Sequence, residues 1–69
     1  MGIVKNQIRD KLGHAKFEEV YRFLVYHRSQ ASEDSMIYEE LKHRVQGNRY
    51  LMTEIFKLDG IVFRELLQK

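Results

Sequence analysis

The strongest constraint on the fold is the spacing of the apolar residues that follow Gly13. They recur at the i, i+3, i+4, i+7 and i+8 positions of a helix and are Phe17, Val20, Tyr21, Leu24 and Val25. This spacing places them on one face, which predicts an amphipathic helix over residues 15 to 28. Gly13 stands where a preceding helix, predicted over residues 3 to 12, needs a left-handed C-terminal cap.

A polar segment, residues 29 to 35, separates this helix from the next. Ser32 or Asp34 is expected to cap a third helix that runs to about Gln46. The apolar face of that helix holds Ile37, Leu41 and Val45. Gly47 is predicted to be its C-terminal cap and Asn48 the N-terminal cap of the following helix.

The last third of the chain allows two interpretations. Asp59-Gly60 between apolar runs is a hairpin signal, but the apolar residues beside it do not alternate as a half-solvated strand requires. A helix keeps its phase across the glycine, with one face made of Leu51, Ile55, Leu58, Val62 and Leu66. We therefore predict helix from Arg49 to Gln68, bent or broken at Gly60, with the hairpin as the alternative.

Composition favours an all-α fold. The chain has 69 residues, no proline and four glycines, which is poor in turn-forming residues for a β protein. We expect one domain over residues 1–69, a compact small helical bundle of three to five helices. The residues expected to form its core are Phe17, Val20, Tyr21, Leu24, Ile37, Leu41, Leu51 and Ile55.

Cysteine is absent, so no disulfide supports the fold, and the composition fits an intracellular, cytoplasmic protein. No apolar stretch approaches the roughly 20 residues of a membrane span, so no membrane partner is expected.

The sequence offers no set of residues for catalysis or metal binding. His14, His27 and His43 are scattered over separate segments, whereas a zinc site needs three or four convergent ligands. The loop serines have no neighbouring histidine base in the sequence, so nucleophilic catalysis is unsupported. We expect a protein that is not an enzyme and that uses no cofactor and no metal.

Several apolar side chains lie off the core-facing lines. They are Phe23 and Tyr26 on the second helix and Met52, Phe56, Phe63 and Leu67 on the last. Surplus apolar lines of this kind often mark an interaction surface, so these residues are the predicted partner-binding site. The expected partner is a helical segment of another protein, lying in a groove between the two helices or on one face; a homodimer would use the same surface. Wider stripes that wrap into the core are the alternative.

Residues 37 to 58 also fit a helix-turn-helix, with Gln46-Gly47-Asn48 as the turn. The outward residues of its second helix would be Arg49, Tyr50, Thr53 and Lys57. Such side chains contact phosphates and bases, but the positive charge is thin for nucleic-acid binding. DNA binding is therefore the alternative to protein docking.

One string carries a family resemblance: Leu12-Gly13-x-x-Lys16-Phe17-x-x-Val20-Tyr21-x-x-Leu24. It resembles a pattern near the C-terminus of some NIMA-related protein kinases, and the match continues loosely through Val45-Gln46-Gly47 and Leu51-Met52-Thr53-Glu54-Ile55 to Leu58. The resemblance implies the non-catalytic tail domain of a larger kinase, with a partner in the cilium, flagellum or basal body. It implies no catalytic residue, because no kinase motif is present. The Asp59-Gly60 step and the C-terminal Arg64-Glu65-Leu66-Leu67-Gln68-Lys69 depart from the family pattern.

Overall fold

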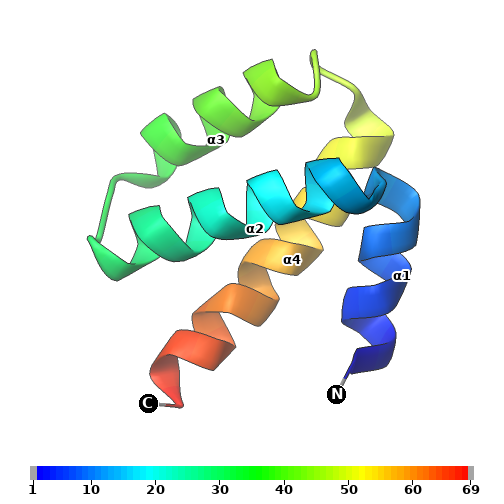
Figure 1. Ribbon diagram of the computed structural model, residues 1–69. Coiled ribbons are helices and arrows are strands. Elements are labelled where there is room, and N and C mark those ends of the chain that lie inside the picture. Colours follow the sequence, from blue (N-terminus) through cyan, green and yellow to red (C-terminus); the bar gives the residue numbers. More distant parts are fainter. Residues whose placement is uncertain (1, 69) are drawn as a thin grey trace.

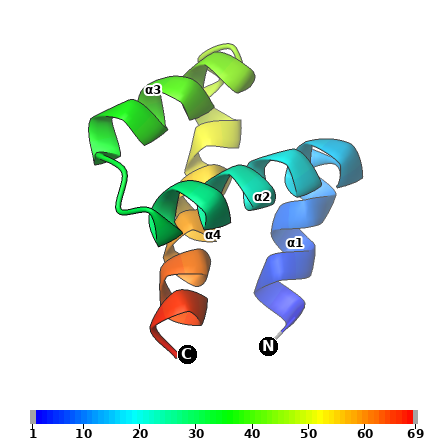
Figure 2. The ribbon, with the colours of Figure 1, turned by 60° about the vertical axis from the view of Figure 1, so that its left-hand side comes forward.

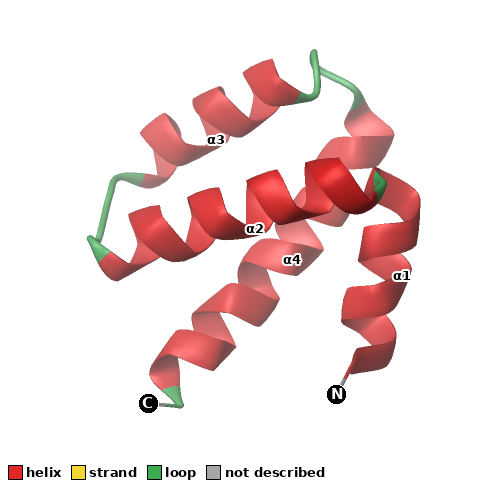
Figure 3. Cartoon of the chain, viewed as in Figure 1, coloured by secondary structure: helices red, strands yellow, loops and turns green. Residues whose placement is uncertain are grey.

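The computed structural model describes residues 2–68, which form four helices joined by short loops (Figure 3). The helices are α1 (Gly2–Leu12), α2 (His14–Ser29), α3 (Asp34–Arg44) and α4 (Arg49–Leu67). The predicted all-α bundle is confirmed. The hairpin alternative is wrong, because α4 continues through Gly60 without a break.

The helices form a flat body that measures 29 × 28 × 17 Å along its principal axes. Figure 1 shows α2 crossing in front of α4, with α3 running antiparallel to α2. Figure 2 shows α1 extending downward from the N-terminal end of α2. The most extensive contacts join α4 to α2 and to α1. With helices packed about 8–10 Å apart, a body this thin cannot cover both faces of every helix.

The core lies where α4 meets α1, α2 and α3. Its fully buried apolar side chains are Ile8, Phe17, Val20, Leu24, Ile37, Leu41, Ile55, Leu58 and Val62, with Val45 6% exposed. The predicted core is confirmed for six of its members, but Tyr21 and Leu51 are only half-buried. Tyr21 lies at the edge because its hydroxyl bonds to Glu65.

The chain reverses at two helix ends through backbone conformations that the sequence did not reveal. After α2, Ser32 N–H donates to the His27 carbonyl and Ala31 N–H to the Arg28 carbonyl, with Ala31 at φ 56°. This is a Schellman motif whose left-handed residue is an alanine rather than a glycine.

The end of α3 repeats this motif one residue earlier than predicted. Gln46, at φ 56°, takes the left-handed position that the sequence assigned to Gly47, and Gly47 donates its N–H to the Lys42 carbonyl. The helix therefore ends at Arg44, not near Gln46.

Besides Gly47, two more cap predictions were wrong, and one is confirmed. Gly13 has a positive φ, but φ 90° and ψ 147° lie outside the left-handed helical region, and the residue is the N-cap of α2. Glu33, not Ser32 or Asp34, is the N-cap of α3 and makes no side-chain cap bond. Asn48 caps α4 as predicted, since its side chain accepts a hydrogen bond from the Leu51 N–H.

Candidate functional site

The predicted partner-binding residues lie in two places rather than one. Met52, Phe56, Phe63 and Leu67 follow one side of α4, and we call them the α4 stripe. Within it Phe56 is 49% exposed, Phe63 45% and Leu67 81%, while Met52 is half-buried against the core. The stripe is therefore apolar surface that the chain itself leaves largely uncovered.

The α2 residues of the predicted site form a separate pair. Phe23 is half-buried, with its ring 4.3 Å from the His27 ring and 4.7 Å from the Arg44 guanidinium. Tyr26 is 57% exposed and touches His27 edge-on at 5.0 Å. Phe23 thus faces α3, away from the α4 stripe, and most of its surface already has partners.

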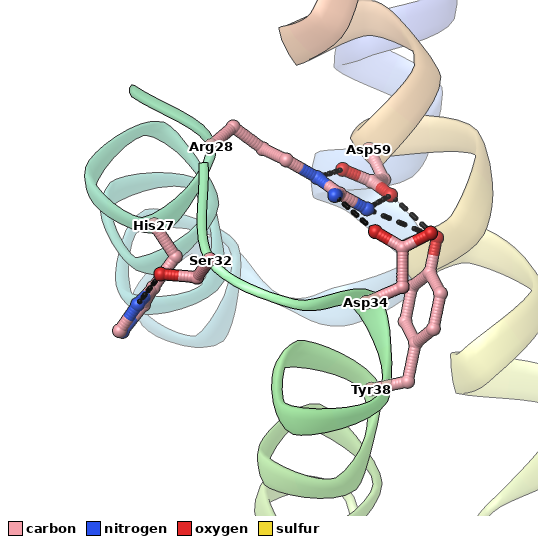
Figure 4. A network of polar contacts seen from close by, with 6 residues as sticks. All are labelled: His27, Arg28, Ser32, Asp34, Tyr38 and Asp59. Carbon is pink, nitrogen blue, oxygen red and sulfur yellow. Dashed lines mark hydrogen bonds and ion pairs between the residues drawn. The ribbon is translucent and has the colours of Figure 1, made fainter. Parts of the chain in front are cut away.

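A polar pair joins α2 to α4 beside the apolar core, near the C-terminal end of α2. Figure 4 shows Arg28 of α2 facing Asp59 of α4, with Asp34 and Tyr38 of α3 beside them; these residues are the Arg28 cluster. Arg28 Nε donates to Asp59 Oδ1 at 3.0 Å and Nη2 donates to Oδ2 at 2.7 Å. A bidentate pair of this kind fixes the crossing of the two helices.

The rest of the Arg28 cluster completes the hydrogen bonding of the buried ions. Tyr38 Oη donates to Asp59 Oδ2 at 2.7 Å, and Arg28 Nη1 donates to Asp34 Oδ1 at 2.5 Å. The side chains of Arg28 and Asp59 are 5% and 4% exposed, whereas that of Asp34 is 70% exposed. The Asp59 bond, opposed in part by burial, raises the pKa of Arg28, and burial followed by the Asp59 bond raises the pKa of Tyr38.

Two residues of the Arg28 cluster contact aromatic rings of the α4 stripe. The Arg28 guanidinium lies 4.4 Å from the centre of the Phe63 ring. The Tyr38 ring meets Phe56 edge-on at 5.2 Å. Contacts of this kind hold exposed aromatic rings in fixed orientations, which lowers the entropy lost when a partner binds.

A second polar contact joins α1, α2 and α4 at the edge of the core. Glu65 accepts from Tyr21 Oη at 2.6 Å and from Lys5 Nζ at 2.8 Å. The Lys5 bond, then the Tyr21 bond, lowers the pKa of Glu65, while the bond to Glu65 is the main cause that raises the pKa of both Lys5 and Tyr21. We call these three residues the Lys5 cluster.

His27 and Ser32 are neighbours in space, contrary to the expectation that the loop serines have no histidine nearby. His27 Nδ1 and Ser32 Oγ lie 3.1 Å apart (Figure 4). The Ser32 N–H also bonds to the His27 carbonyl. Within residues 2–68 no carboxylate is bonded to this histidine, so the pair closes the loop after α2 but lacks the orienting group of a catalytic triad.

The outward face of α4 carries the residues of the helix-turn-helix alternative. Arg49, Tyr50, Thr53 and Lys57 are all exposed, with Tyr50 at 58%. Gly60 and Arg64 share this face, and the sequence analysis did not assign them to it. A helical wheel of residues 49 to 67 would have shown them, because both lie opposite Leu58 and Val62.

The described residues lack the features of a metal site and of a membrane span. The described part of the chain contains no cluster of three or more His, Cys, Asp or Glu side chains that could hold a metal ion. None of its helices is both long and apolar enough to cross a membrane.

Comparisons of the chain with models of protein families, with curated proteins and with solved structures found no match.

Proposed function

We propose that this chain is a non-catalytic docking domain that binds another protein through the α4 stripe. The supporting observation is the exposure of Phe56, Phe63 and Leu67 on one side of a single helix. Aromatic side chains are the most frequent anchors of protein interfaces, and a methionine adds an adaptable contact. The contacts of Phe56 with Tyr38 and of Phe63 with Arg28 keep these anchors oriented before a partner arrives.

The sequence resemblance supports a setting for this function. A NIMA-related kinase tail would recruit a partner at the cilium, flagellum or basal body, and this remains a proposal drawn from residues 9 to about 58. A homodimerisation module is a second use of the same stripe. DNA binding through Arg49, Tyr50, Thr53 and Lys57 is supported by their exposure on α4, directly after the turn at residues 45–48.

The test is a pull-down from an extract of ciliated cells with the parent chain and with Phe56→Asp and Phe63→Asp. Because both rings are about half-exposed, we expect these variants to keep the helical circular dichroism spectrum of the parent and to lose a specifically captured protein. Tyr26→Asp, on the separate α2 pair, is the matched control and should keep it.

Other outcomes would place the binding surface elsewhere or change the proposed function. If Tyr26→Asp loses the captured protein and the α4 variants keep it, docking uses α2 instead. If the parent binds duplex DNA at physiological salt, and Arg49→Ala with Lys57→Ala abolishes this binding, the helix-turn-helix function replaces docking.

A further inference from the structure

The charged side chains of α4 divide by sign between its two faces. Glu54 and Asp59 are each 3% exposed, and Glu65 is bonded to Lys5 and Tyr21. The buried Glu54 carboxylate lies 3.4 Å from Lys57 Nζ and 3.7 Å from Lys11 Nζ. On the outward face of α4, in contrast, the charged residues are Arg49, Lys57 and Arg64, all of them exposed.

Two of these cations, Lys57 and Arg64, flank the α4 stripe. At about 100° per residue, Lys57 and Arg64 lie on one side of the outward face and Phe56 and Phe63 on the other. Lys57 keeps 53% of its side chain exposed despite its contact with Glu54. Arg49 and Arg64 form no ion pair with another of residues 2–68. The outward face therefore has an apolar edge and a cationic edge.

Gly60 lies between these two edges, surrounded on the helix surface by Phe56, Lys57, Phe63 and Arg64 at positions i−4, i−3, i+3 and i+4. The fold does not require a glycine here. A Cβ atom would meet nothing within 4 Å, and the backbone conformation is that of an ordinary helix. A glycine within a helix costs about 0.5–1 kcal/mol relative to alanine, and no close packing against residues 2–68 accounts for it.

A notch with no side chain is useful when another backbone or a large side chain must approach closely. We infer that the outward face of α4 binds an acidic amphipathic helix of another protein, which places an apolar side chain into the Gly60 notch and carboxylates beside Lys57 and Arg64. This inference rests on the proposed docking function and adds the chemistry of the partner.

Other occupants fit the same face less well. A second copy of this chain would bring the same cations to a symmetric contact, whereas its α4 carboxylates Glu54 and Asp59 are buried and Glu65 is bonded to Lys5 and Tyr21. Duplex DNA would satisfy the cations but would leave Phe56, Phe63 and Leu67 without an apolar partner. An acidic amphipathic helix matches both edges of the face.

The experiment is selection of a displayed library of helical peptides on three forms of the full chain: the parent, Phe56→Asp, and Lys57→Glu with Arg64→Glu. We expect the parent to enrich peptides with apolar residues at i, i+3, i+4 and i+7 and with flanking Asp or Glu. The charge-reversed form should enrich Lys or Arg at the same flanking positions, and Phe56→Asp should enrich neither class.

The best parent-selected peptide is then titrated against purified variants by fluorescence anisotropy. Lys57→Glu with Arg64→Glu and, separately, Gly60→Leu should each weaken binding about tenfold or more, which corresponds to about 1.4 kcal/mol. Lys42→Glu, an exposed cation on α3, is the matched control and should leave the affinity unchanged. Gly60→Ala should raise the midpoint of thermal unfolding and lower the affinity for the peptide. A purely structural role of Gly60 would not give these two effects together.

The outcomes separate this inference from the function on which it rests. Enriched peptides that depend on Phe56 but show no acidic preference would overturn the acidic partner and keep docking by the α4 stripe. Peptides that bind the Phe56→Asp form equally would overturn both. Self-association of the parent that Gly60→Leu abolishes, or duplex DNA binding that the charge reversal abolishes, would replace the acidic helix with a second copy or with DNA.

Discussion

The inward face of α4 buries a charged side chain, whereas its outward face exposes aromatic ones. The inward face buries Leu58 and Val62 completely but also holds Asp59, whose carboxylate accepts three hydrogen bonds at 2.7–3.0 Å. The outward face leaves Phe56 and Phe63 about half-exposed beside cations. Buried polar groups whose hydrogen bonds are satisfied within the chain stabilise the fold. Exposed aromatic rings that no other side chain covers indicate a surface used in binding.

Two phenylalanines give the largest test of this comparison. Phe17 is 1% exposed and Phe56 is 49% exposed. Phe17→Ala should lower the free energy of unfolding by about 3–5 kcal/mol, because it leaves a cavity in the core. Phe56→Ala should cost about 1 kcal/mol or less, since mainly its contact with Tyr38 is lost.

Urea unfolding followed by circular dichroism measures both values. Since a domain of this size has only a few kcal/mol of stability, Phe17→Ala is expected to be largely unfolded at 25 °C. Equal losses for the two variants would show that Phe56 belongs to the core and that the inward and outward faces are not distinct.

Two carboxylates on one guanidinium give a sharper comparison of buried with exposed charge. Asp59 and Asp34 both bond to Arg28, but their side chains are 4% and 70% exposed. Asp59→Ala should destabilise the chain by about 3 kcal/mol, because it leaves the Arg28 charge buried without its main partner. Asp34→Ala should cost no more than about 1 kcal/mol, as exposed ion pairs do.

The control for this pair is the double variant Arg28→Met with Asp59→Leu, which removes both charges. It should lose less stability than Asp59→Ala alone, because no unpaired ion remains. If it loses as much, the Arg28 cluster stabilises the crossing of α2 and α4 through its specific geometry rather than by mutual neutralisation.

The Lys5 cluster lies at the margin between the two faces and gives the smallest effect. The pKa of Glu65 is lowered below its ordinary value of 4.5, so its contribution is present above that value and is lost as the pH falls through the lower folded pKa. The pKa of Lys5 is raised above 10.5, so its contribution is present below that value and is lost at higher pH. Between these limits the cluster stabilises the fold.

Glu65→Gln should therefore reduce stability near pH 7 by less than about 1 kcal/mol, because the Glu65 side chain is 41% exposed. The difference from the parent should shrink as the pH falls below about 4, where the carboxylate of the parent also becomes neutral. Urea unfolding across this range measures the difference. A difference that does not change with pH would mean that the effect comes from packing and not from the charge of Glu65.

Local patterns in the sequence were enough for most of the secondary structure. Apolar spacing predicted α2 and the continuous α4, and the Asn48 cap followed from its own side chain and the next turn. The residues with left-handed backbone conformation were harder to predict from the sequence. Ala31 and Gln46 adopt φ 56° although glycine is the usual residue there. Because Gly47 was taken as the cap, the end of α3 was predicted at about Gln46 and not at Arg44.

What the sequence determined by itself is the set of helices, the core residues near the centre of each apolar face, and the candidates for exposed apolar surface. Only the tertiary structure decided which of these candidates lie together. Arg28 meets Asp59 across 31 residues and joins α2 to α4, and Lys5 meets Glu65 across 60 and joins α1 to α4. Helix periodicity acts over one or two turns and assigns a side chain to a face, whereas the neighbour that this face meets depends on how the helices cross.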